Sequence, residues 1–390
     1  MTGSDESTGL VSGRSVAAGG WPARARELVQ LDRTVVRAFL VSRAVVLVAA
    51  VLAESVVPRN PALTSGDAGP LLRSLTAWDG WWYLGIARDG YHAAPLVGAY
   101  HDYAFLPLYP LLVGALAWPW PDLIGLVSVV ASNVFALVGL GLLVHLGEPY
   151  LGRERASHAA AFMAIAPFAF VFAMAYAESV FLILSVGAFV ALERGHRRAA
   201  GVLMALASLA RLQGVLLVVP LVLLAWLRDG RRVSASQGWL LLAPIAVLAF
   251  LGFVSWLTGS AGAYGGAQAA WGRGGLGAAP AGESLGANLS VQNVISLATL
   301  CAAVFLLVFL RADYRRHRIP WPYALVPVLF LAAVFISGTL ESVGRYALLA
   351  FPFAWVLASR PAGFQRVWPV LSLAGLFAAA VSSFAGWLVP

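Results

Sequence analysis

The sequence predicts an all-α, polytopic membrane protein, and three observations carry this prediction. Of its 390 residues, 60% are hydrophobic and only 11% are charged, whereas soluble domains carry about 25% charged residues. The mean hydropathy is +0.81. Apolar runs of about 20 residues, the length that crosses a bilayer as a helix, recur from Val35 almost to the C-terminus. A helical bundle of this length can form one domain.

The apolar segments are expected to form a bundle of about 9–11 transmembrane helices, with one segment broken in the middle. Their expected bounds are 35–57, 123–145, 157–175, 178–193, 199–227, 237–257, 291–311, 321–337, 343–358 and 367–388.

The residues before the first apolar segment are polar, with many Gly, Ser and Arg residues. They have no apolar core ahead of a small-residue cleavage site, which argues against a signal peptide. Segments that bury little apolar surface stay disordered. We therefore expect a disordered cytoplasmic tail at 1–31 and a single transmembrane domain at 32–390.

The basic residues of the chain are all Arg, a bias typical of a GC-rich bacterial genome, and they set the predicted topology. Arg clusters of membrane proteins collect in cytoplasmic loops. The net charge of +8 is therefore ordinary for this class, and no compact basic stripe indicates a nucleic-acid partner. We expect a multi-pass protein of the cytoplasmic membrane with a cytoplasmic N-terminus.

All Arg clusters can lie on the cytoplasmic side only under two conditions. Segment 105–118, which contains prolines, must lie at the outer surface as a juxtamembrane helix instead of crossing. Segment 199–227 must consist of two half-helices that meet near Arg211. Each half has about a dozen residues, or roughly 18 Å, which is too short for about 30 Å of hydrocarbon.

This topology brings the remaining ionisable residues to the outer face. They lie in the first outer loop at 58–122, at Glu178, at Arg211, in the Gly-rich outer loop at 258–290, and near Arg345. Polar groups at membrane depth are costly and usually line a cavity or a site. The sequence therefore predicts a functional site at this face.

The first outer loop contains Asp79 in the run Trp78-Asp79-Gly80-Trp81-Trp82-Tyr83. One interpretation is an interfacial aromatic belt in which the Asp caps a helix. The other is a general base beside aromatic surfaces that contact sugar or isoprenoid, because a base must reach the hydroxyl that it deprotonates.

Four blocks, in order, resemble the PIG-V group of GPI-anchor mannosyltransferases and its bacterial relatives. They are Trp-Asp-Gly-x-x-Tyr-x-x-Ile-Ala-x-x-Gly-Tyr at 78–91, Ala-Phe-Leu-Pro-Leu-Tyr-Pro-Leu-Leu at 104–112, Tyr-Ala-Glu-Ser-Val-Phe at 176–181 and Arg-Leu-Gln-Gly at 211–214. The chain departs from the group at Trp82, where many relatives carry His, and at Leu106, where they carry Phe. Trp82 puts in doubt any role of a His at that position.

The resemblance implies a GT-C-type bundle with its active site at the extracytoplasmic face and a catalytic acid in the first outer loop. It also implies a polyprenyl-phosphate sugar, most simply mannose, as the donor. The absence of a Gly-x-x-x-x-Gly-Lys phosphate loop from the sequence agrees with a donor that is not a nucleotide sugar. Arabinose or glucose in place of mannose stays open.

On this reading Asp79 deprotonates the acceptor hydroxyl and the sugar is transferred with inversion. Arg211 and Arg345 bind the donor phosphate, a role that suits a guanidinium. Arg211 could instead pair with a carboxylate, and Arg345 could pair with Glu341 at the (i, i+4) spacing of a helix. Further substrate contacts are expected at Trp78, Trp81, Trp82, Tyr83, His92, Tyr109, Tyr176, Glu178, Gln213 and Glu341.

Glu178 also has a simpler explanation, because the helix dipole favours an acid in the first turn. His92, His101 and Asp102 share the first loop with Asp79, but their spacing fits no metal-ligand pattern, so we expect neither a metal nor another cofactor.

The Gly-rich outer loop contains Tyr264, Trp271 and Arg273 and is either a connector or a lid.

The expected partners are a polyprenyl-phosphate sugar donor, a glycan, glycolipid or protein acceptor, and the lipid bilayer. A transporter or lipid flippase is the alternative from another class, since broken helices and intramembrane Arg residues occur there too, although no internal repeat is visible.

Overall fold

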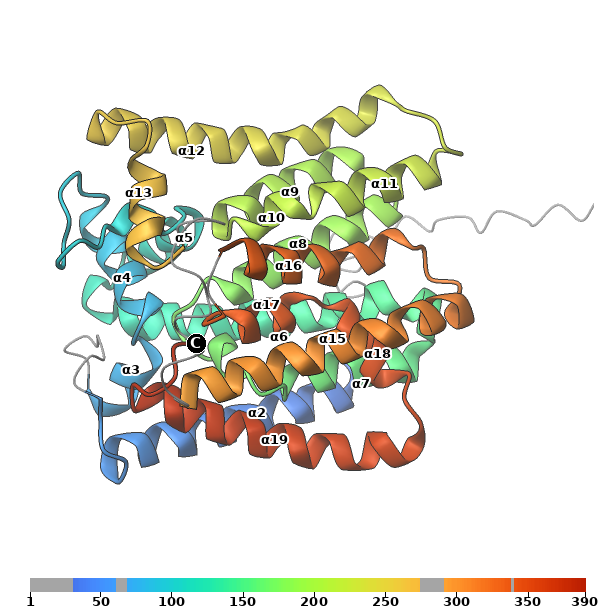
Figure 1. Ribbon diagram of the computed structural model, residues 1–390, viewed down its shortest axis with the longest axis horizontal. Coiled ribbons are helices and arrows are strands. Elements are labelled where there is room, and N and C mark those ends of the chain that lie inside the picture. The colour runs from blue at the N-terminus through green and yellow to red at the C-terminus, as the bar shows by residue number, and fades with distance from the viewer. Residues whose placement is uncertain (1–30, 61–68, 274–290, 338–339) are drawn as a thin grey trace, which may run out of the picture.

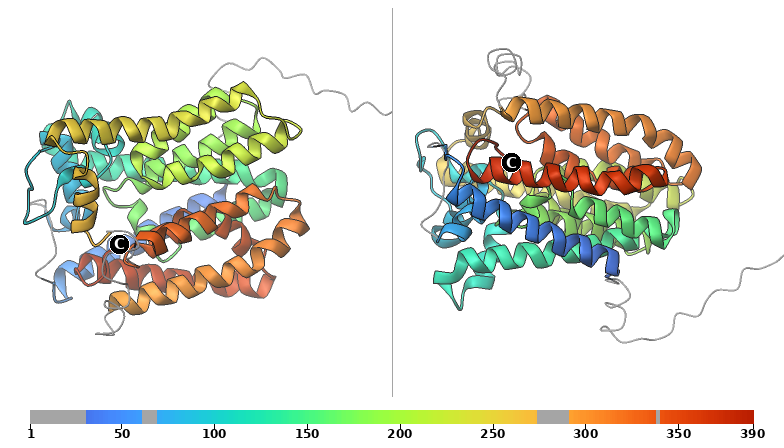
Figure 2. Two further views of the ribbon diagram at one scale, coloured as in Figure 1. Left: turned by 45° about the horizontal axis from the view of Figure 1, so that its top comes forward. Right: turned by 90° about the horizontal axis from the view of Figure 1, so that it is seen from below.

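The computed structural model of the chain describes residues 31–60, 69–273, 291–337 and 340–390. Within these ranges the secondary structure is helical and no β-strand forms. The long helices run side by side along the longest dimension of the molecule (Figure 1, Figure 2). The predicted all-α membrane bundle is confirmed. The predicted tail at 1–31 falls outside the described residues, apart from Leu31.

Five helical segments of the described chain are long and apolar enough to cross a membrane. They are Arg33–Ser55 (α2), Pro121–Leu151 (α6, Ile124–Leu151, with the turn before it), Ala235–Thr258 (α12, Leu242–Thr258, with the turn before it), Gln292–His317 (in α15, Val291–His317) and Ala362–Phe384 (α19).

Shorter helices fill the middle of the bundle. The predicted number of about 9–11 transmembrane helices counts these shorter helices together with the five long segments. Among them, α8 (Glu178–Glu193) is buried along nearly its whole length and packs against α6 and against α9 (Arg197–Ala210). The helix α16 (Pro322–Ser337) packs against α11 (Val218–Arg228). A helix enclosed by protein can be shorter than the hydrocarbon thickness, because buried irregular backbone next to it can complete the crossing.

The predicted break in segment 199–227 is confirmed. The helix α9 ends at Ala210, Arg211 is extended (φ −150°, ψ 136°), and the chain returns through α10 (Gln213–Leu216) and α11. An ion pair joins Arg197, at the start of α9, to Asp229, just after α11. It holds together the two helix ends that lie farthest from the break at Arg211. Both halves therefore return to the same end of the bundle, as Figure 1 shows.

Two predicted spans are wrong as continuous helices. The segment 157–175 is helical only to Ala164, where α7 (Arg153–Ala164) ends before Pro167, and then runs irregularly to α8. The segment 343–358 consists of two helices, α17 (Val343–Leu349) and α18 (Pro352–Ala358). An irregular backbone is tolerated at membrane depth where protein buries it, and apolar composition alone cannot reveal such a stretch.

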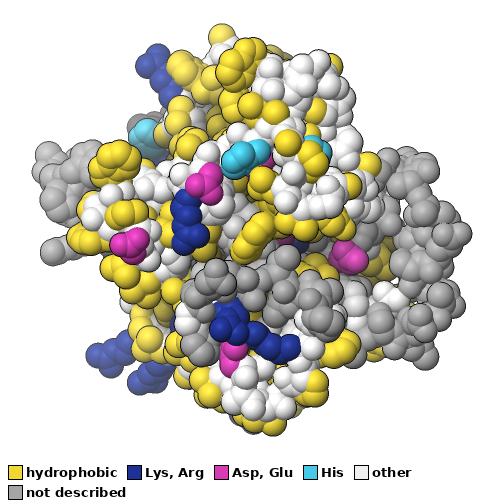
Figure 3. Space-filling view, turned by 90° about the vertical axis from the view of Figure 1, so that its left-hand side faces the viewer, with side chains coloured by type: hydrophobic (Ala, Val, Ile, Leu, Met, Phe, Trp, Pro, Cys, Tyr) yellow, Lys and Arg dark blue, Asp and Glu magenta, His cyan; other side chains and the backbone are white. Residues whose placement is uncertain are grey.

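Short helices gather at one end of the bundle, the left end in Figure 1, which Figure 3 shows face on. The predicted juxtamembrane segment 105–118 forms one of them, α5, which at ten residues is about 15 Å long. The helices at this end are α3 (Pro70–Leu75), α4 (Asp79–Asp89), α5 (Leu108–Ala117) and α13 (Ala263–Ala270).

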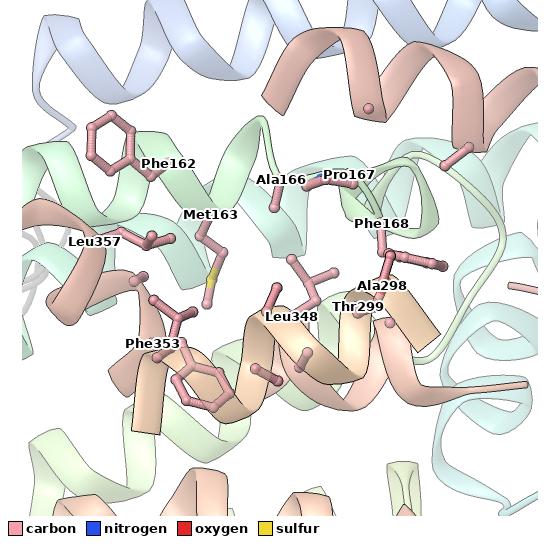
Figure 4. A pocket seen from close by; sticks show the side chains of 18 of the residues that line it. Phe162, Met163, Ala166, Pro167, Phe168, Ala298, Thr299, Leu348, Phe353 and Leu357 are labelled. Atoms are coloured by element: carbon pink, nitrogen blue, oxygen red, sulfur yellow. The ribbon is translucent and has the colours of Figure 1, made fainter. Parts of the chain in front are cut away.

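The helix α17 separates two cavities inside the bundle. Arg345 lines one, of about 490 Å³, together with residues of α4, α10, α13 and α16. Gly344 and Leu348 line the other, of about 380 Å³, which is enclosed by α7, α15, α18 and α19. Figure 4 shows this second cavity, which apolar side chains such as those of Met163 and Leu348 line. Successive residues of one short helix thus face different surroundings.

Candidate active site

Asp79 is the first residue of α4, and an unusual turn places it there. Trp78 has φ 58°, a left-handed conformation that is rare for residues other than glycine. Its indole Nε1 donates a hydrogen bond to the Ser383 carbonyl at 3.0 Å. The Asp79 backbone N–H donates to the Tyr176 hydroxyl at 3.2 Å. Contacts to two distant parts of the chain therefore fix this helix start, where the dipole favours a carboxylate.

Four charged side chains from four elements form one buried cluster at this point. Arg345 Nη1 forms an ion pair with Asp79 Oδ2 and lies 3.3 Å from Glu178 Oε1. Arg211 Nη1 lies 2.6 Å from the same Glu178 oxygen. We call Asp79, Glu178, Arg211 and Arg345 the charge cluster. The structure thus brings together residues up to 266 positions apart in the sequence.

Burial makes this cluster energetically demanding. Glu178 is fully buried, and Arg345 is only 1% exposed. Arg345 Nη2 also donates to Ser342 Oγ at 2.8 Å, while Glu178 Oε2 and the Nε atoms of both arginines have no hydrogen-bond partner within the described chain. Buried charges persist only when they are paired and hydrogen-bonded. The cluster is therefore internally neutral and keeps capacity for further polar contacts.

The pKa of Asp79 reflects two opposing effects. Burial raises the pKa, because it disfavours the charged carboxylate. The positive charges of Arg345, Arg273 and Arg211 and the hydrogen bond from Arg345 lower it by more, so the pKa lies below its ordinary value. Asp79 is accordingly a carboxylate at neutral pH and can accept a proton.

The cavity beside the cluster has a polar end and an apolar end. Asp79, Arg211 and Arg345 line its polar end, and apolar residues of α10 and α16 line the other. Ile336, on the apolar wall, is 56% exposed, so this wall reaches the lateral surface of the bundle. A cavity of this form can hold a charged group and an apolar chain of the same molecule.

The described part of the Gly-rich outer loop covers this cavity as an ordered helix. In α13, Gln268 Nε2 donates to the Ala104 carbonyl at 2.8 Å. Trp271 packs edge-on against Trp82 and Phe105, with ring centroids 5.6 and 5.7 Å apart. The Gly-rich outer loop, which was expected to be either a connector or a lid, is therefore docked on the first outer loop as far as residue 273. Residues 274–290 lie outside the described chain.

Arg273 differs from the other arginines that line the cavity. Its Nη1 lies 3.4 Å from Gln268 Oε1, and no carboxylate of the described chain forms an ion pair with it. Arg211 and Arg345 each pair with a carboxylate. Apart from its place in the Gly-rich loop, nothing in the sequence singles out Arg273, because a missing ion pair is visible only in three dimensions.

Some predicted substrate-binding residues line the cavity, and others support it from behind. Tyr83 and Gln213 lie on its wall. Tyr176 lies behind the cluster, with its ring 5.9 Å from the Arg345 guanidinium carbon. Glu178 also lies behind the cluster's arginines. It contacts Arg211 and Arg345, which line the cavity, but does not line the cavity itself. Both side chains therefore lie behind the arginines and do not line the cavity.

The remaining predicted contacts lie off the cavity wall. Trp82 stacks on Phe105 at 5.6 Å and meets Trp81 edge-on at 5.0 Å, so these rings form the packing beneath the wall. Trp78 holds the helix start described above. These tryptophans do not line the cavity, and the contact with sugar or isoprenoid expected of them stays a prediction. Three others have partners elsewhere: Tyr109 bonds Ser132, His92 bonds Asp102, and Glu341 accepts from Gln292 through its carbonyl.

Metal binding has no cluster of ligands to support it in the described chain. The His92 ring and Asp102 form a pair, with Nδ1 2.8 Å from Oδ2. No group of three or more His, Cys, Asp or Glu side chains is close enough there to hold an ion. The expectation that the site uses no metal stays a prediction.

Comparison with known proteins agrees with the four sequence blocks. Residues 34–225 match the family described as Mannosyltransferase (PIG-V). GPI alpha-1,6-mannosyltransferase 2 of Cricetulus griseus is 35% identical over 158 residues, and that of Mus musculus is 35% identical over 155. These matches cover 38% and 37% of this chain but only 31% and 30% of the relatives. The chain therefore spans about a third of their length.

A solved structure also aligns over much of the chain. It is the archaeal oligosaccharyltransferase AglB from Archaeoglobus fulgidus, in complex with an inhibitory peptide and a dolichol-phosphate. The identity is 13%, the alignment covers 90% of this chain and 56% of that one, and the TM-score is 0.48.

Proposed function

We propose that this chain, which over residues 34–225 is similar to the PIG-V mannosyltransferase family, is a membrane glycosyltransferase of the GT-C type. It transfers mannose from a polyprenyl-phosphate-mannose donor to a hydroxyl of a glycan, glycolipid or protein. The reaction takes place at the extracytoplasmic face of the cell membrane. The observation that carries the proposal is the cavity in which an ionised Asp79, guanidinium groups and an apolar wall meet.

In this reaction Asp79 is the general base. The acceptor hydroxyl gives its proton to the carboxylate while its oxygen forms a bond to the anomeric carbon. The bond between that carbon and the phosphate oxygen breaks, and the polyprenyl phosphate leaves on the opposite side with the electron pair, so the configuration inverts. Because the pKa of Asp79 is low, the carboxylate is a weak base. Proton transfer is therefore late, after bond formation has made the hydroxyl more acidic.

The donor phosphate is proposed to contact Arg273 and Arg211. Arg273 lines the cavity and forms no ion pair with a carboxylate of the described chain, so a phosphate can pair with it at no cost to an ion pair described there. Arg211 retains an Nε–H with no partner in the described chain. Arg345 is committed to Asp79 and positions it. Preorganised cations of this kind offset the charge that develops on a leaving phosphate.

The apolar end of the cavity is proposed to take the first isoprenoid units of the donor. Leu216 on α10 and Leu329 and Ile336 on α16 supply this wall. Because the wall reaches the lateral surface, the rest of the lipid can stay in the bilayer while the sugar lies beside Asp79. The proposed reaction requires no cofactor.

The decisive experiment compares Asp79→Asn with the wild-type chain in reconstituted membranes that contain polyprenyl-phosphate-mannose and a total lipid and glycan extract as acceptor. We expect release of polyprenyl phosphate to fall by about 10²- to 10⁴-fold, the usual contribution of a general base. Asp89→Asn is the matched control, because Asp89 ends the same helix, is exposed and does not line the cavity. Transfer by Asp79→Asn at the wild-type rate would remove Asp79 from this role.

The phosphate assignment is tested separately with Arg273→Gln. We expect the KM for the donor to rise and the KM for the acceptor to stay the same. An equal change in both constants would contradict a specific contact with phosphate. Release of the lipid phosphate by purified protein without a membrane gradient would also separate this function from that of a transporter.

A further inference from the structure

A second Arg-rich region lies at the opposite end of the bundle from the charge cluster. It surrounds a cavity of about 860 Å³ between the start of α7, the end of α15 and the start of α19. Four arginines and two carboxylates line this cavity. They are Arg153, Arg155, Arg316, Arg360, Glu154 and Asp313. We call it the basic cavity.

The arginines of the basic cavity fall into two classes. Arg360 forms an ion pair with Asp313, and Arg153 lies 3.2 Å from Glu148. Arg155 and Arg316 are exposed and form no ion pair with a carboxylate of the described chain. Arg155 and Arg316 therefore face the basic cavity without an ion-paired carboxylate, and the four arginines of its lining outnumber the two carboxylates, which favours an anionic ligand.

The basic cavity continues into an apolar groove of about 510 Å³ between α2, α7 and α19. His158, Ala362 and Gln365 line both, so the two spaces meet along a shared edge. Beyond that edge the groove is lined mostly by apolar residues, among them Ala38, Val41, Phe162, Ile165, Pro369 and Leu373, while Arg37 and Arg366 add two exposed positive charges to its lining. Val41 is 46% exposed, so the groove opens on the side of the bundle that faces lipid.

The combination is more specific than an Arg cluster that only sets topology. Topology requires positive charge in a loop, but neither a cavity nor an adjoining apolar groove. A free phosphate or nucleotide would use the charges but would leave the groove unused. A phospholipid with an anionic head group matches both parts, and basic pockets between transmembrane helices are known to bind such head groups.

We propose that the basic cavity and its groove bind an anionic phospholipid. The head-group phosphate lies against Arg155 and Arg316, and an acyl chain lies along the groove between α2, α7 and α19. This site is independent of the proposed transfer reaction, because it shares no residue with the cavity at Asp79.

The test measures lipid retained by the full chain in native mass spectrometry, after incubation with phosphatidylglycerol or with phosphatidylcholine. We expect preferential retention of phosphatidylglycerol, and a loss of about thirtyfold in its affinity for the double variant Arg155→Gln/Arg316→Gln. The matched control is Arg311→Gln/Arg315→Gln. It removes two exposed charges from the same helix end, outside the basic cavity. An equal loss in this control, or no loss in the test variant, would overturn the proposal.

A second variant separates a lipid from a free anion. Ala38→Phe places a ring in the groove without changing any charge, and we expect it to reduce phosphatidylglycerol retention as well. If Ala38→Phe has no effect and inorganic phosphate displaces the lipid, the site binds only the anion and the proposal of a lipid site is wrong.

Discussion

At one end of the bundle Arg211 and Arg345 are buried and each is paired with a carboxylate, whereas at the other end Arg155 and Arg316 are exposed and have no such partner in the described chain. The residue type is the same and only the surroundings differ. Arg211 and Arg345 hold carboxylates in place, and Arg211 keeps its Nε–H for a further contact within the described chain, whereas the guanidiniums of Arg155 and Arg316 have no such commitment there. The difference teaches that the function of an arginine in this protein depends on burial and partner more than on its place in a charge cluster.

The largest expected effect comes from breaking the buried side of this comparison. Glu178→Gln leaves Arg211 and Arg345 with less compensation in a fully buried position. Removing one partner of such a cluster costs about 3–5 kcal/mol. The free energy of unfolding in detergent micelles measures it. Glu148→Gln, at the half-exposed pair with Arg153, should cost less than about 1 kcal/mol, and equal losses would break the comparison.

A smaller effect is expected at the break between the half-helices. A Cβ on Gly214 would lie 2.6 Å from the Ser208 backbone, which cannot move aside as a side chain could. Overpacking of this kind costs about 1–3 kcal/mol. Gly214→Ala should therefore lower the unfolding temperature. Gly238→Ala is the control, because nothing lies within 4 Å of its added Cβ. Unchanged stability of Gly214→Ala would mean that the break does not need this close approach.

A still smaller effect is expected where α13 docks on the first outer loop. Gln268→Ala removes the hydrogen bond to the Ala104 carbonyl, a contact worth about 0.5–1.5 kcal/mol. We expect a rise in the KM for the donor of roughly two- to tenfold. Gln237→Ala removes a comparable bond, to Asp229, near the other end of the broken segment. It should leave this KM unchanged, and a similar rise in both variants would show a general loss of structure.

The smallest expected effect concerns pH. Because the folded pKa of Asp79 is below its unfolded value of about 3.9, the carboxylate stabilises the fold above that value, and this contribution is lost as the pH falls through the folded pKa. The kcat/KM for transfer should therefore show no loss from Asp79 between pH 8 and pH 5. A loss centred near pH 6 that Asp79→Asn abolishes would show that Arg345 does not hold this carboxylate ionised.

The sequence was sufficient for the helical class, for the break at Arg211 and for the short helix expected within 105–118, which the structure has at Leu108–Ala117. The helical class follows from the length of the apolar runs, which the thickness of the bilayer sets. The break and the short helix follow from the placement of Arg residues and prolines along the chain. It was also sufficient to place Asp79, Glu178, Arg211 and Arg345 at one end. It could not determine which carboxylate each arginine contacts, since those contacts join residues far apart in the chain.

The aromatic residues show the same limit. Trp82 was expected to contact substrate, but its ring is buried between Phe105 and Trp271. A run of aromatic residues looks the same in sequence whether it lines a cavity or fills a core. The irregular stretch that begins after Ala164 was missed for a similar reason, because buried irregular backbone and buried helix have the same apolar composition.

The neutrality of the charge cluster has a consequence for the order of events. Two carboxylates and two guanidiniums cancel before the proposed reaction. When Asp79 takes the acceptor proton, the cluster acquires one net positive charge, while the departing lipid phosphate gains one negative charge. Attraction between protein and product is therefore stronger than between protein and donor. In the proposed reaction, loss of the proton from Asp79 to solvent restores the neutrality of the cluster and so favours release of the spent lipid.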